Sequence, residues 1–190
     1  MKKCFFVLIL SFFMCFHTQA NVTLSCDPTE SSIKFKTKLL SLFDVSGSFD
    51  AMSVDIDLRD TNIINSVKVR IDTNSINTNN KTRDRDLKGK KFLNAIENPY
   101  ITFEVNKELT VQDRSIVGEL KINGIKKEID FPVYMQYLKN EGTNQYVLSV
   151  KSKKIIINRH DFNISDYPVF ISDEIDVEID LVLKVYINPA

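Results

Sequence analysis

Residues 175–187 read IDVEIDLVLKVYI, and this stretch decides the fold class. Every second residue is apolar, and in the first half the residues between them are the acids Asp176, Glu178 and Asp180. A period of two places apolar side chains on one face of an extended strand and charged side chains on the other. The stretch therefore predicts a long strand of an antiparallel sheet that has one apolar and one solvated face.

The same alternation recurs in residues 33–39, 49–58, 67–71, 100–105 and 129–135, with a change of phase near Ala51. Turn-forming residues follow at 44–47, 60–62, 112–113, 123–124 and 140–142, and the Asn-Gly pair at 123–124 is the sharpest hairpin signal. The pattern predicts about eight strands in one all-β domain. Long antiparallel strands favour a closed barrel, because closure leaves no unpaired edge.

The apolar face is expected to point inward. The opposite face carries many charges, among them Lys34, Lys36, Asp55 and Glu178. Packing these charges into the narrow interior of an eight-stranded barrel would leave them poorly solvated, so a barrel with its apolar face toward lipid is disfavoured. The interior is then either a filled core or an apolar tube, and periodicity leaves both open.

The first twenty residues are interpreted as a cleaved secretory signal peptide. Lys2 and Lys3 precede an apolar run over 4–16, and Ala20 supplies a small residue at the expected cleavage site. The remaining residues, 21–190, form the predicted single domain, which carries 25 acidic and 25 − 2 = 23 basic side chains. This balance does not suit a nucleic-acid partner. No second long apolar run follows, so we expect no stable membrane insertion.

The sequence offers no recognisable catalytic or metal-binding cluster. Cys26 is the one cysteine after the signal peptide, so an internal disulfide is not expected, whereas an intermolecular one remains open. His160 is the one histidine in the same region and stands between Arg159 and Asp161. We interpret it as a polar neighbour of a structural Arg–Asp pair. We therefore predict a protein that is not an enzyme and holds no metal.

Residues 82–105, TRDRDLKGKKFLNAIENPYITFEV, interrupt the alternation. We predict a short helix within 86–95, with Asp84 or Asp86 near its N-terminus, where the helix dipole favours acids. Leu87, Phe92, Leu93 and Ile96 are expected to gather on one side of it. The helix must end before Pro99, and a strand follows over 100–105. Such a helix can close one end of a barrel, with Phe92 and Leu93 over its mouth.

Spaced motifs in this chain resemble the YceI-like family over residues 27–187. The matching residues are Asp27, Pro28, Ser31 or Ser32, Gly47, Phe49, Ser75, Ile76, Thr78, Arg83, Asp84, Leu87, Phe92, Pro99, Ile101, Phe103, Gly118, Leu120, Asn123, Gly124, Ile125, Lys127, Asn158, Arg159, Asp161 and Phe162. The resemblance implies a lipocalin-like extended barrel that is exported to the bacterial periplasm. It also implies a long polyisoprenoid ligand, such as a quinone or polyprenyl tail, and a role for Arg83 and Asp84 in fixing the closing helix.

Two positions depart from the family pattern. Thr29, Glu30 and Ser31 stand where the family has a histidine before the serine of the first strand. Asn163 stands where the family has a glycine. Because asparagine tolerates the left-handed backbone region better than most residues, we expect the turn at 163 to survive.

The resulting prediction is a periplasmic carrier or sequestering protein for an isoprenoid lipid, which takes the place of a cofactor. The alternative is a stress-associated or protein-interaction barrel with a filled core and no lipid. A homodimer is left open in both cases. The side chains predicted from strand phase to contact the ligand are Phe35, Phe49, Val69, Ile71, Phe92, Phe103, Phe131, Val133, Leu181 and Leu183.

Overall fold

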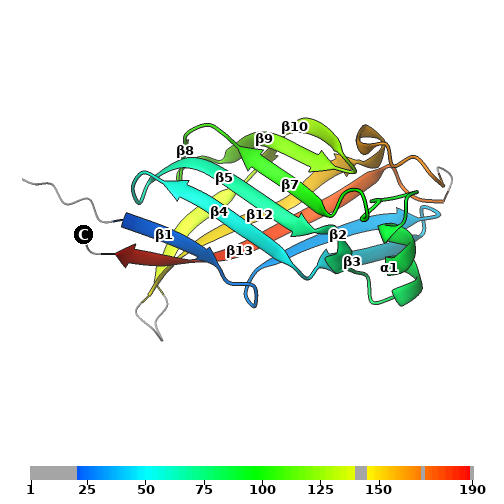
Figure 1. The fold of residues 1–190 in the computed structure, drawn as a ribbon, viewed down its shortest axis with the longest axis horizontal. Coiled ribbons are helices and arrows are strands. Elements are labelled where there is room, and N and C mark those ends of the chain that lie inside the picture. The colour runs from blue at the N-terminus through cyan, green and yellow to red at the C-terminus, as the bar shows by residue number, and fades with distance from the viewer. Residues whose placement is uncertain (1–20, 140–144, 168–169, 189–190) are drawn as a thin grey trace, which may run out of the picture.

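The computed structural model describes residues 21–139, 145–167 and 170–188 and has an elongated all-β body (Figure 1). The predicted signal peptide, 1–20, and the predicted turn at 140–142 lie outside these residues. Within the described ranges the structure has thirteen strands, all paired antiparallel in two sheets. The prediction of an all-β antiparallel fold is confirmed, and the strand count of eight is wrong.

The first sheet has the strand order β11-β12-β13-β2-β3-β6, and β1 also pairs with β13. Its strands are β1 (Asn21–Cys26), β2 (Ser32–Leu39), β3 (Phe43–Phe49), β6 (Ile76–Asn77), β11 (Tyr134–Lys139), β12 (Tyr146–Asn158) and β13 (Glu174–Asn188). The long strand predicted over 175–187 is β13, which pairs with β2 along residues 176–180 and with β1 along 183–188. Its length allows it to hold two strands end to end.

The second sheet has the order β10-β9-β7-β5-β4, with β8 also paired to β5. Its strands are β4 (Met52–Leu58), β5 (Ile63–Asp72), β7 (Tyr100–Val105), β8 (Leu109–Thr110), β9 (Ser115–Ile122) and β10 (Ile125–Pro132). Among the described residues, no strand ladder joins this sheet to the first one. Side chains from both sheets nevertheless form one apolar core.

The chain passes between the sheets at sharp corners, and these corners raise the number of strands. The run 49–58 bends at Asp50 and Ala51, where the sequence predicted a change of phase. A 3-10 helix, η1 (Thr73–Ser75), leads from β5 to β6. The run 129–135, predicted as one strand, divides at Val133 between β10 and β11. An alternating run that continues around a corner looks like one strand in the sequence.

Turn-forming residues predicted the turn at 123–124 correctly and the turn at 44–47 wrongly. Asn123 and Gly124 form the β9–β10 turn with φ of 48° and 78°, as expected for an Asn-Gly pair. The turn predicted at 44–47 is wrong, because these residues belong to β3 and the turn lies at Leu40 and Ser41. Asn163 has φ 55° and ψ 29° at the end of the 3-10 helix η2 (Arg159–Phe162), so the left-handed turn is present.

The helix α1 (Lys81–Lys88) lies at one end of the body, while β1 begins and β13 ends at the other (Figure 1). It starts earlier than predicted because the Asn80 side chain caps it, accepting hydrogen bonds from the backbone N–H groups of Thr82 and Arg83. Phe92 and Leu93 follow in turns rather than in the helix. Ile96 is 95% exposed, so its predicted place on the apolar side of the helix is wrong.

The inward direction of the apolar face is confirmed for the described strands. Ile33, Val54 and Leu181 are buried, whereas their neighbours Lys34 and Asp55 are exposed. The charged faces therefore surround the body, and the apolar faces enclose its interior.

Candidate ligand-binding cavity

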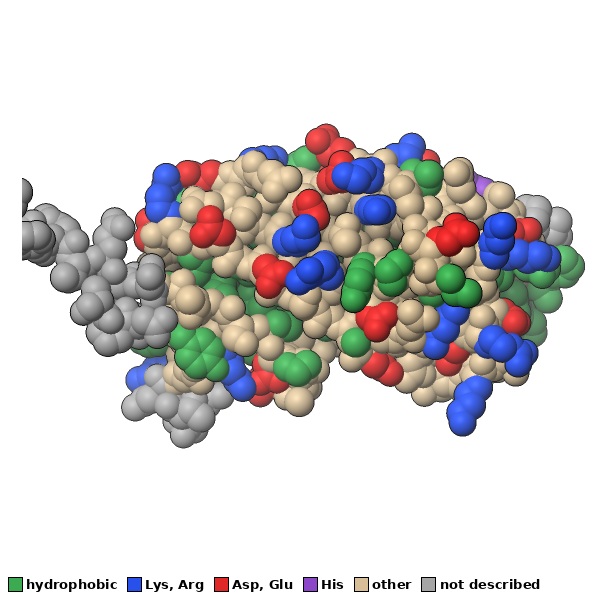
Figure 2. Space-filling model, viewed as in Figure 1, with side chains coloured by type: hydrophobic (Ala, Val, Ile, Leu, Met, Phe, Trp, Pro, Cys, Tyr) green, Lys and Arg blue, Asp and Glu red, His purple; other side chains and the backbone are tan. Residues whose placement is uncertain are grey.

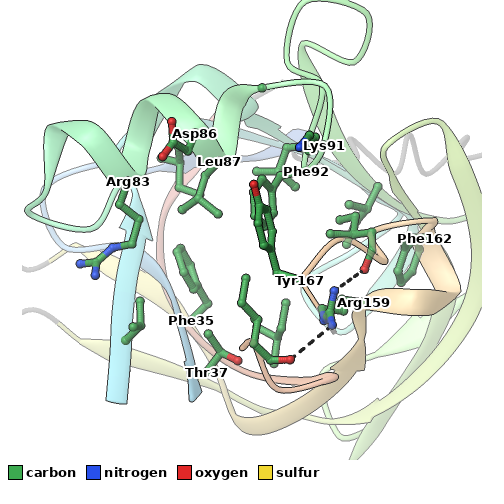
Figure 3. A pocket seen from close by; sticks show the side chains of 18 of the residues that line it. Phe35, Thr37, Arg83, Asp86, Leu87, Lys91, Phe92, Arg159, Phe162 and Tyr167 are labelled. Carbon is green, nitrogen blue, oxygen red and sulfur yellow. Dashed lines mark hydrogen bonds between the residues drawn. The ribbon is translucent and has the colours of Figure 1, made fainter. Parts of the chain in front are cut away.

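A cavity of about 710 Å³ opens at the end of the body where α1 lies (Figure 3). This volume falls within the range of pockets that hold small molecules and cofactors, about 300–1,000 Å³. Apolar side chains from both sheets, α1 and the segments around η2 form its wall. They are Phe35, Leu39, Val45, Phe49, Ile76, Leu87, Phe92, Leu93, Ile101, Ile122, Ile157, Phe162, Ile164, Ile171, Ile175 and Val177.

Three of the ten predicted ligand-contacting residues line this cavity: Phe35, Phe49 and Phe92. The rings of Phe35 and Phe49 lie 5.7 Å apart on neighbouring strands. Gly47 makes room for Phe35, because a Cβ there would lie 2.5 Å from Phe35 Cζ. The glycine of the family motif therefore has a packing role here.

The other seven predicted residues lie away from the cavity, in or against the packed core. They are Val69, Ile71, Phe103, Phe131, Val133, Leu181 and Leu183. Phe103 is partly buried, with its ring 5.2 Å from that of Phe131, and the other six are buried. Strand phase separates inside from outside, but it carries no information on position along the length of the body.

Several wall residues lie outside the strands predicted from the sequence and were not predicted to contact the ligand. They include Ile76, Ile122, Ile164 and Ile171. Ile101, Ile175 and Val177 have the inward apolar phase, but strand phase does not indicate how far along the body a residue lies. Tyr167 had no signal, since it lies outside any alternating run. Its ring stacks on Phe92 with centroids 5.9 Å apart, and Lys91 Nζ lies 5.4 Å from its centre.

The rim of the cavity is polar and mainly basic. It is formed by Thr37, Lys38, Asn80, Thr82, Arg83, Arg85, Asp86, Lys90 and Lys91. Figure 3 shows Leu87, Phe92 and Tyr167 directed toward the cavity and Arg83 directed away from it. The arrangement combines an apolar interior with a charged entrance, which suits an amphipathic ligand.

Thr78 anchors α1 to the end of β6. Its backbone N–H and its hydroxyl donate to Asp84 Oδ1 at 2.8 and 2.6 Å. Arg83 Nε donates to the Thr78 hydroxyl at 2.8 Å, and Arg83 Nη2 donates to its carbonyl at 2.9 Å. Arg83 and Asp84 therefore hold the helix beside the cavity, as the family resemblance implied.

Arg159 anchors the opposite wall. Its guanidinium group is buried and donates to the carbonyl oxygens of Ile164, Asp166, Ile171 and Ser172 at 2.8–3.3 Å. These bonds fold back the segment that carries Ile164 and Ile171 into the cavity wall. Such a hydrogen-bond set accounts for a buried charge without any catalytic role.

The partner carboxylate of Arg159 is Asp173, at 3.2 Å, and not Asp161 as expected from the sequence. Asp161 lies 3.9 Å from Lys127 instead. His160 Nε2 also contacts Asp173, at 2.6 Å, and together with the Arg159 charge it lowers the pKa of the Asp173 carboxyl. In the parts of the chain that the structure describes, no His, Cys, Asp and Glu side chains gather as metal ligands.

A model of the YceI-like domain matches residues 24–183. A search of curated proteins found no match. The fold is similar to a polyisoprenoid binding domain from Saccharophagus degradans implicated in plant cell wall breakdown, with 17% identity and a TM-score of 0.69 over 87% of this chain and 100% of that one. It is also similar to BcnA of Burkholderia cenocepacia, with 19% identity and a TM-score of 0.66 over 83% and 98% of the two chains.

A YCEI protein of Campylobacter jejuni has 26% identity and a TM-score of 0.65, over 75% of this chain and 86% of that one. The family model covers most of the 190 residues, and the all-β fold agrees with it. The chain belongs to the YceI-like family.

Proposed function

We propose that this protein binds a long isoprenoid lipid, with its apolar chain in the cavity and its head group at the rim. The observation that carries the proposal is the cavity of about 710 Å³, whose wall is almost entirely aliphatic and aromatic. The polyisoprenoid binding domain with the same fold supports the choice of ligand class. A quinone or a polyprenyl chain satisfies this description.

Burial of the isoprenoid chain supplies enough free energy for stable binding. Each five-carbon unit contributes up to roughly 4 kcal/mol, at about 0.8 kcal/mol per buried carbon. Micromolar affinity corresponds to about 8 kcal/mol, so a few buried units reach it after the costs of association are subtracted. Such a ligand stays bound during purification.

The proposed role is that of a periplasmic carrier or sequestering protein. The apolar run at 4–16 supports export. Among the described residues, no helix has the length and apolar character needed to cross a bilayer. A binding role is preferred over catalysis because Arg159, His160 and Asp173 are engaged in holding the cavity wall.

Native mass spectrometry of the protein purified from its own envelope tests the proposal, followed by organic extraction and identification of bound lipid. We expect a mass increment from one isoprenoid lipid per chain, and the extract identifies its head group. A bare protein mass that stays unchanged after incubation with quinones and polyprenyl phosphates contradicts the proposal. That outcome favours the alternative, a scaffold that acts through its outer surface.

A further inference from the structure

Six exposed apolar side chains gather beside the entrance of the cavity. We call them the mouth patch, and they are Leu39, Leu40, Leu42, Phe43, Tyr167 and Phe170. Leu42 and Phe43 are 78% and 61% exposed. The β2–β3 turn and the segment before β13 are joined by a backbone hydrogen bond of 2.7 Å from Leu40 N–H to the Phe170 carbonyl, and Leu39 pairs with Ile171.

The turn that carries the mouth patch has an unusual sequence. Leu40 and Ser41 have φ of 53° and 56°, and Leu42 N–H donates to the Leu39 carbonyl at 3.1 Å, which is the geometry of a type I′ turn. Asparagine and glycine favour that backbone, whereas leucine adopts it only with strain. The chain thus places Leu40 where the backbone favours asparagine or glycine, and it exposes the side chain of Leu42, where solvent favours a polar residue. Violations of local preference concentrate at functional sites.

Positive charge is concentrated at the same end of the molecule. Residues 81–91 hold six cations, Lys81, Arg83, Arg85, Lys88, Lys90 and Lys91, against the two acids Asp84 and Asp86, which gives a net charge of 6 − 2 = +4. Residues 21–190 as a whole have a formal net charge of 23 − 25 = −2. Figure 2 shows hydrophobic side chains with lysine and arginine alongside at the end where Figure 1 places α1.

The mouth patch is continuous with the cavity, because Leu39 and Tyr167 belong to both. Lys91 lies over the Tyr167 ring and connects the basic segment to the patch. Leucine and phenylalanine side chains surrounded by lysine and arginine are the combination that binds the interface of an anionic bilayer. A cluster of exposed apolar side chains with polar residues around it marks an interaction site.

We propose that this end of the protein docks reversibly on an anionic lipid bilayer. Leu42, Phe43 and Phe170 enter the interface, and Arg85, Lys90 and Lys91 face the lipid phosphates. Docking in this orientation places the entrance of the cavity against the membrane. In this position an isoprenoid chain passes between the bilayer and the cavity without crossing water. This role in lipid exchange rests on the proposed function. The docking itself does not depend on a bound ligand.

Vesicle co-sedimentation tests the docking, with vesicles of phosphatidylcholine alone and vesicles that also contain phosphatidylglycerol, both free of isoprenoids. We expect binding to the anionic vesicles, little binding to the neutral ones, and release in ~1 M salt, where charges are screened beyond ~3 Å. Leu42→Ser should weaken binding about 10-fold by removing one inserted side chain. The double variant Lys90→Glu/Lys91→Glu should weaken it at least ~30-fold, because two attractive charges become repulsive.

Matched controls lie at the opposite end of the body. Leu138 on β11 is an exposed leucine, and Lys107 and Lys139 are exposed lysines with no ion pair shown in the described structure. Leu138→Ser and Lys107→Glu/Lys139→Glu make the same chemical changes there. Each should bind anionic vesicles within about 3-fold of the unchanged protein, because an apolar side chain far from the membrane does not insert and a distant charge is screened.

Equal binding to neutral and anionic vesicles, absence of binding to both, or equal losses in the control variants would overturn the docking proposal. Sedimentation velocity over a range of protein concentrations tests another occupant of the patch. A dimer that Leu42→Ser dissociates would assign the mouth patch to a second copy of the chain and would likewise overturn docking. Native mass spectrometry of the same samples shows whether lipid is bound, so failure of docking and failure of the proposed function are distinguished.

Discussion

At the scale of single residues, Asp27 explains how the chain passes from β1 to β2 along β13. Its carboxylate accepts hydrogen bonds from Thr29 N–H at 2.9 Å and from the Thr29 hydroxyl at 2.6 Å, and lies 2.6 Å from Lys184 Nζ. Its backbone N–H donates to the Val182 carbonyl, and Ser31 Oγ accepts from Val182 N–H. Asp27 and Ser31 thus provide hydrogen-bond partners for the backbone of Val182, which lies between the parts of β13 that pair with β1 and β2.

We expect Asp27→Asn to lower the melting temperature at neutral pH and to have less effect in acid. The Lys184 ammonium and the Thr29 hydrogen bonds hold the pKa of the Asp27 carboxyl far below its ordinary value. The unfolded chain therefore takes up the proton first, so the stability from Asp27 is full above about pH 4 and is lost as pH falls toward the folded-state pKa.

Thermal unfolding followed by circular dichroism from neutral pH to strong acid measures this difference. Asp55→Asn is the control, because Asp55 pairs with Arg70 at 3.2 Å on the solvated face and such exposed pairs contribute little. A melting-temperature difference between Asp27→Asn and the unchanged protein that stays constant across this pH range would contradict the assigned role.

At the scale of secondary structure, α1 depends on contacts outside itself. It has eight residues and no buried side chain, and so short a helix is not stable alone. Asn80 caps its first turn, and Thr78 binds both Arg83 and Asp84. The helix that forms part of the cavity wall is therefore held by hydrogen bonds to the buried Thr78, the residue that follows β6.

We expect Thr78→Val to loosen α1 while the sheets stay intact. Valine keeps the shape of threonine but removes the hydroxyl, which costs about 1–3 kcal/mol when charged partners lose a hydrogen bond. Hydrogen–deuterium exchange read by mass spectrometry should show faster exchange across residues 79–95. Release of bound lipid should become faster in the same variant.

Thr110→Val is the matched control for this experiment. The Thr110 hydroxyl also donates to a carboxylate, Asp113 at 3.1 Å, but in the turn between β8 and β9. Its exchange changes should be confined to that turn. Unchanged exchange across 79–95 in Thr78→Val would show that α1 is held by its apolar contacts instead.

At the scale of the whole molecule, the interior is packed in one part and hollow in another. Phe131, Leu181 and Leu183 belong to the packed core, while Phe35 and Phe49 face the cavity. The two interpretations left open by the alternation, a filled core and an apolar tube, thus each describe part of the body. The packed part provides stability, and the hollow part provides room for a ligand.

The same substitution, isoleucine to phenylalanine, at one buried position in each part tests the two parts separately. Ile157 lines the cavity, and Ile116 belongs to the core and does not. We expect Ile157→Phe to fill cavity space and lower the amount of bound lipid, with a stability change below about 1 kcal/mol. Ile116→Phe should lower the free energy of unfolding by about 1–3 kcal/mol through overpacking.

Urea unfolding and native mass spectrometry of both variants provide the two measurements. Ile116→Phe should keep its lipid under conditions where it is folded. Equal lipid content in Ile157→Phe and in the unchanged protein would place the ligand outside this cavity.

The sequence by itself determined the antiparallel all-β class, the direction of the apolar face, the Asn123–Gly124 hairpin and the family. These properties depend on neighbouring residues and on spacings along the chain, both of which can be seen in the sequence. It did not determine the division of the run 129–135 at Val133, because the alternation continues around the corner. It also did not determine the start of α1, because Asn80 caps the helix although Asp84 and Asp86 also suit a helix N-terminus.

Only the tertiary structure decided which inward side chains face open space. Phe49 and Phe131 have the same inward phase, yet one lines the cavity and the other packs against Phe103. It also paired Arg159 with Asp173, fourteen residues away, and brought the Leu40 turn beside Phe170. These contacts depend on depth along the body and on the folding of distant segments against one another, which a period of two does not encode.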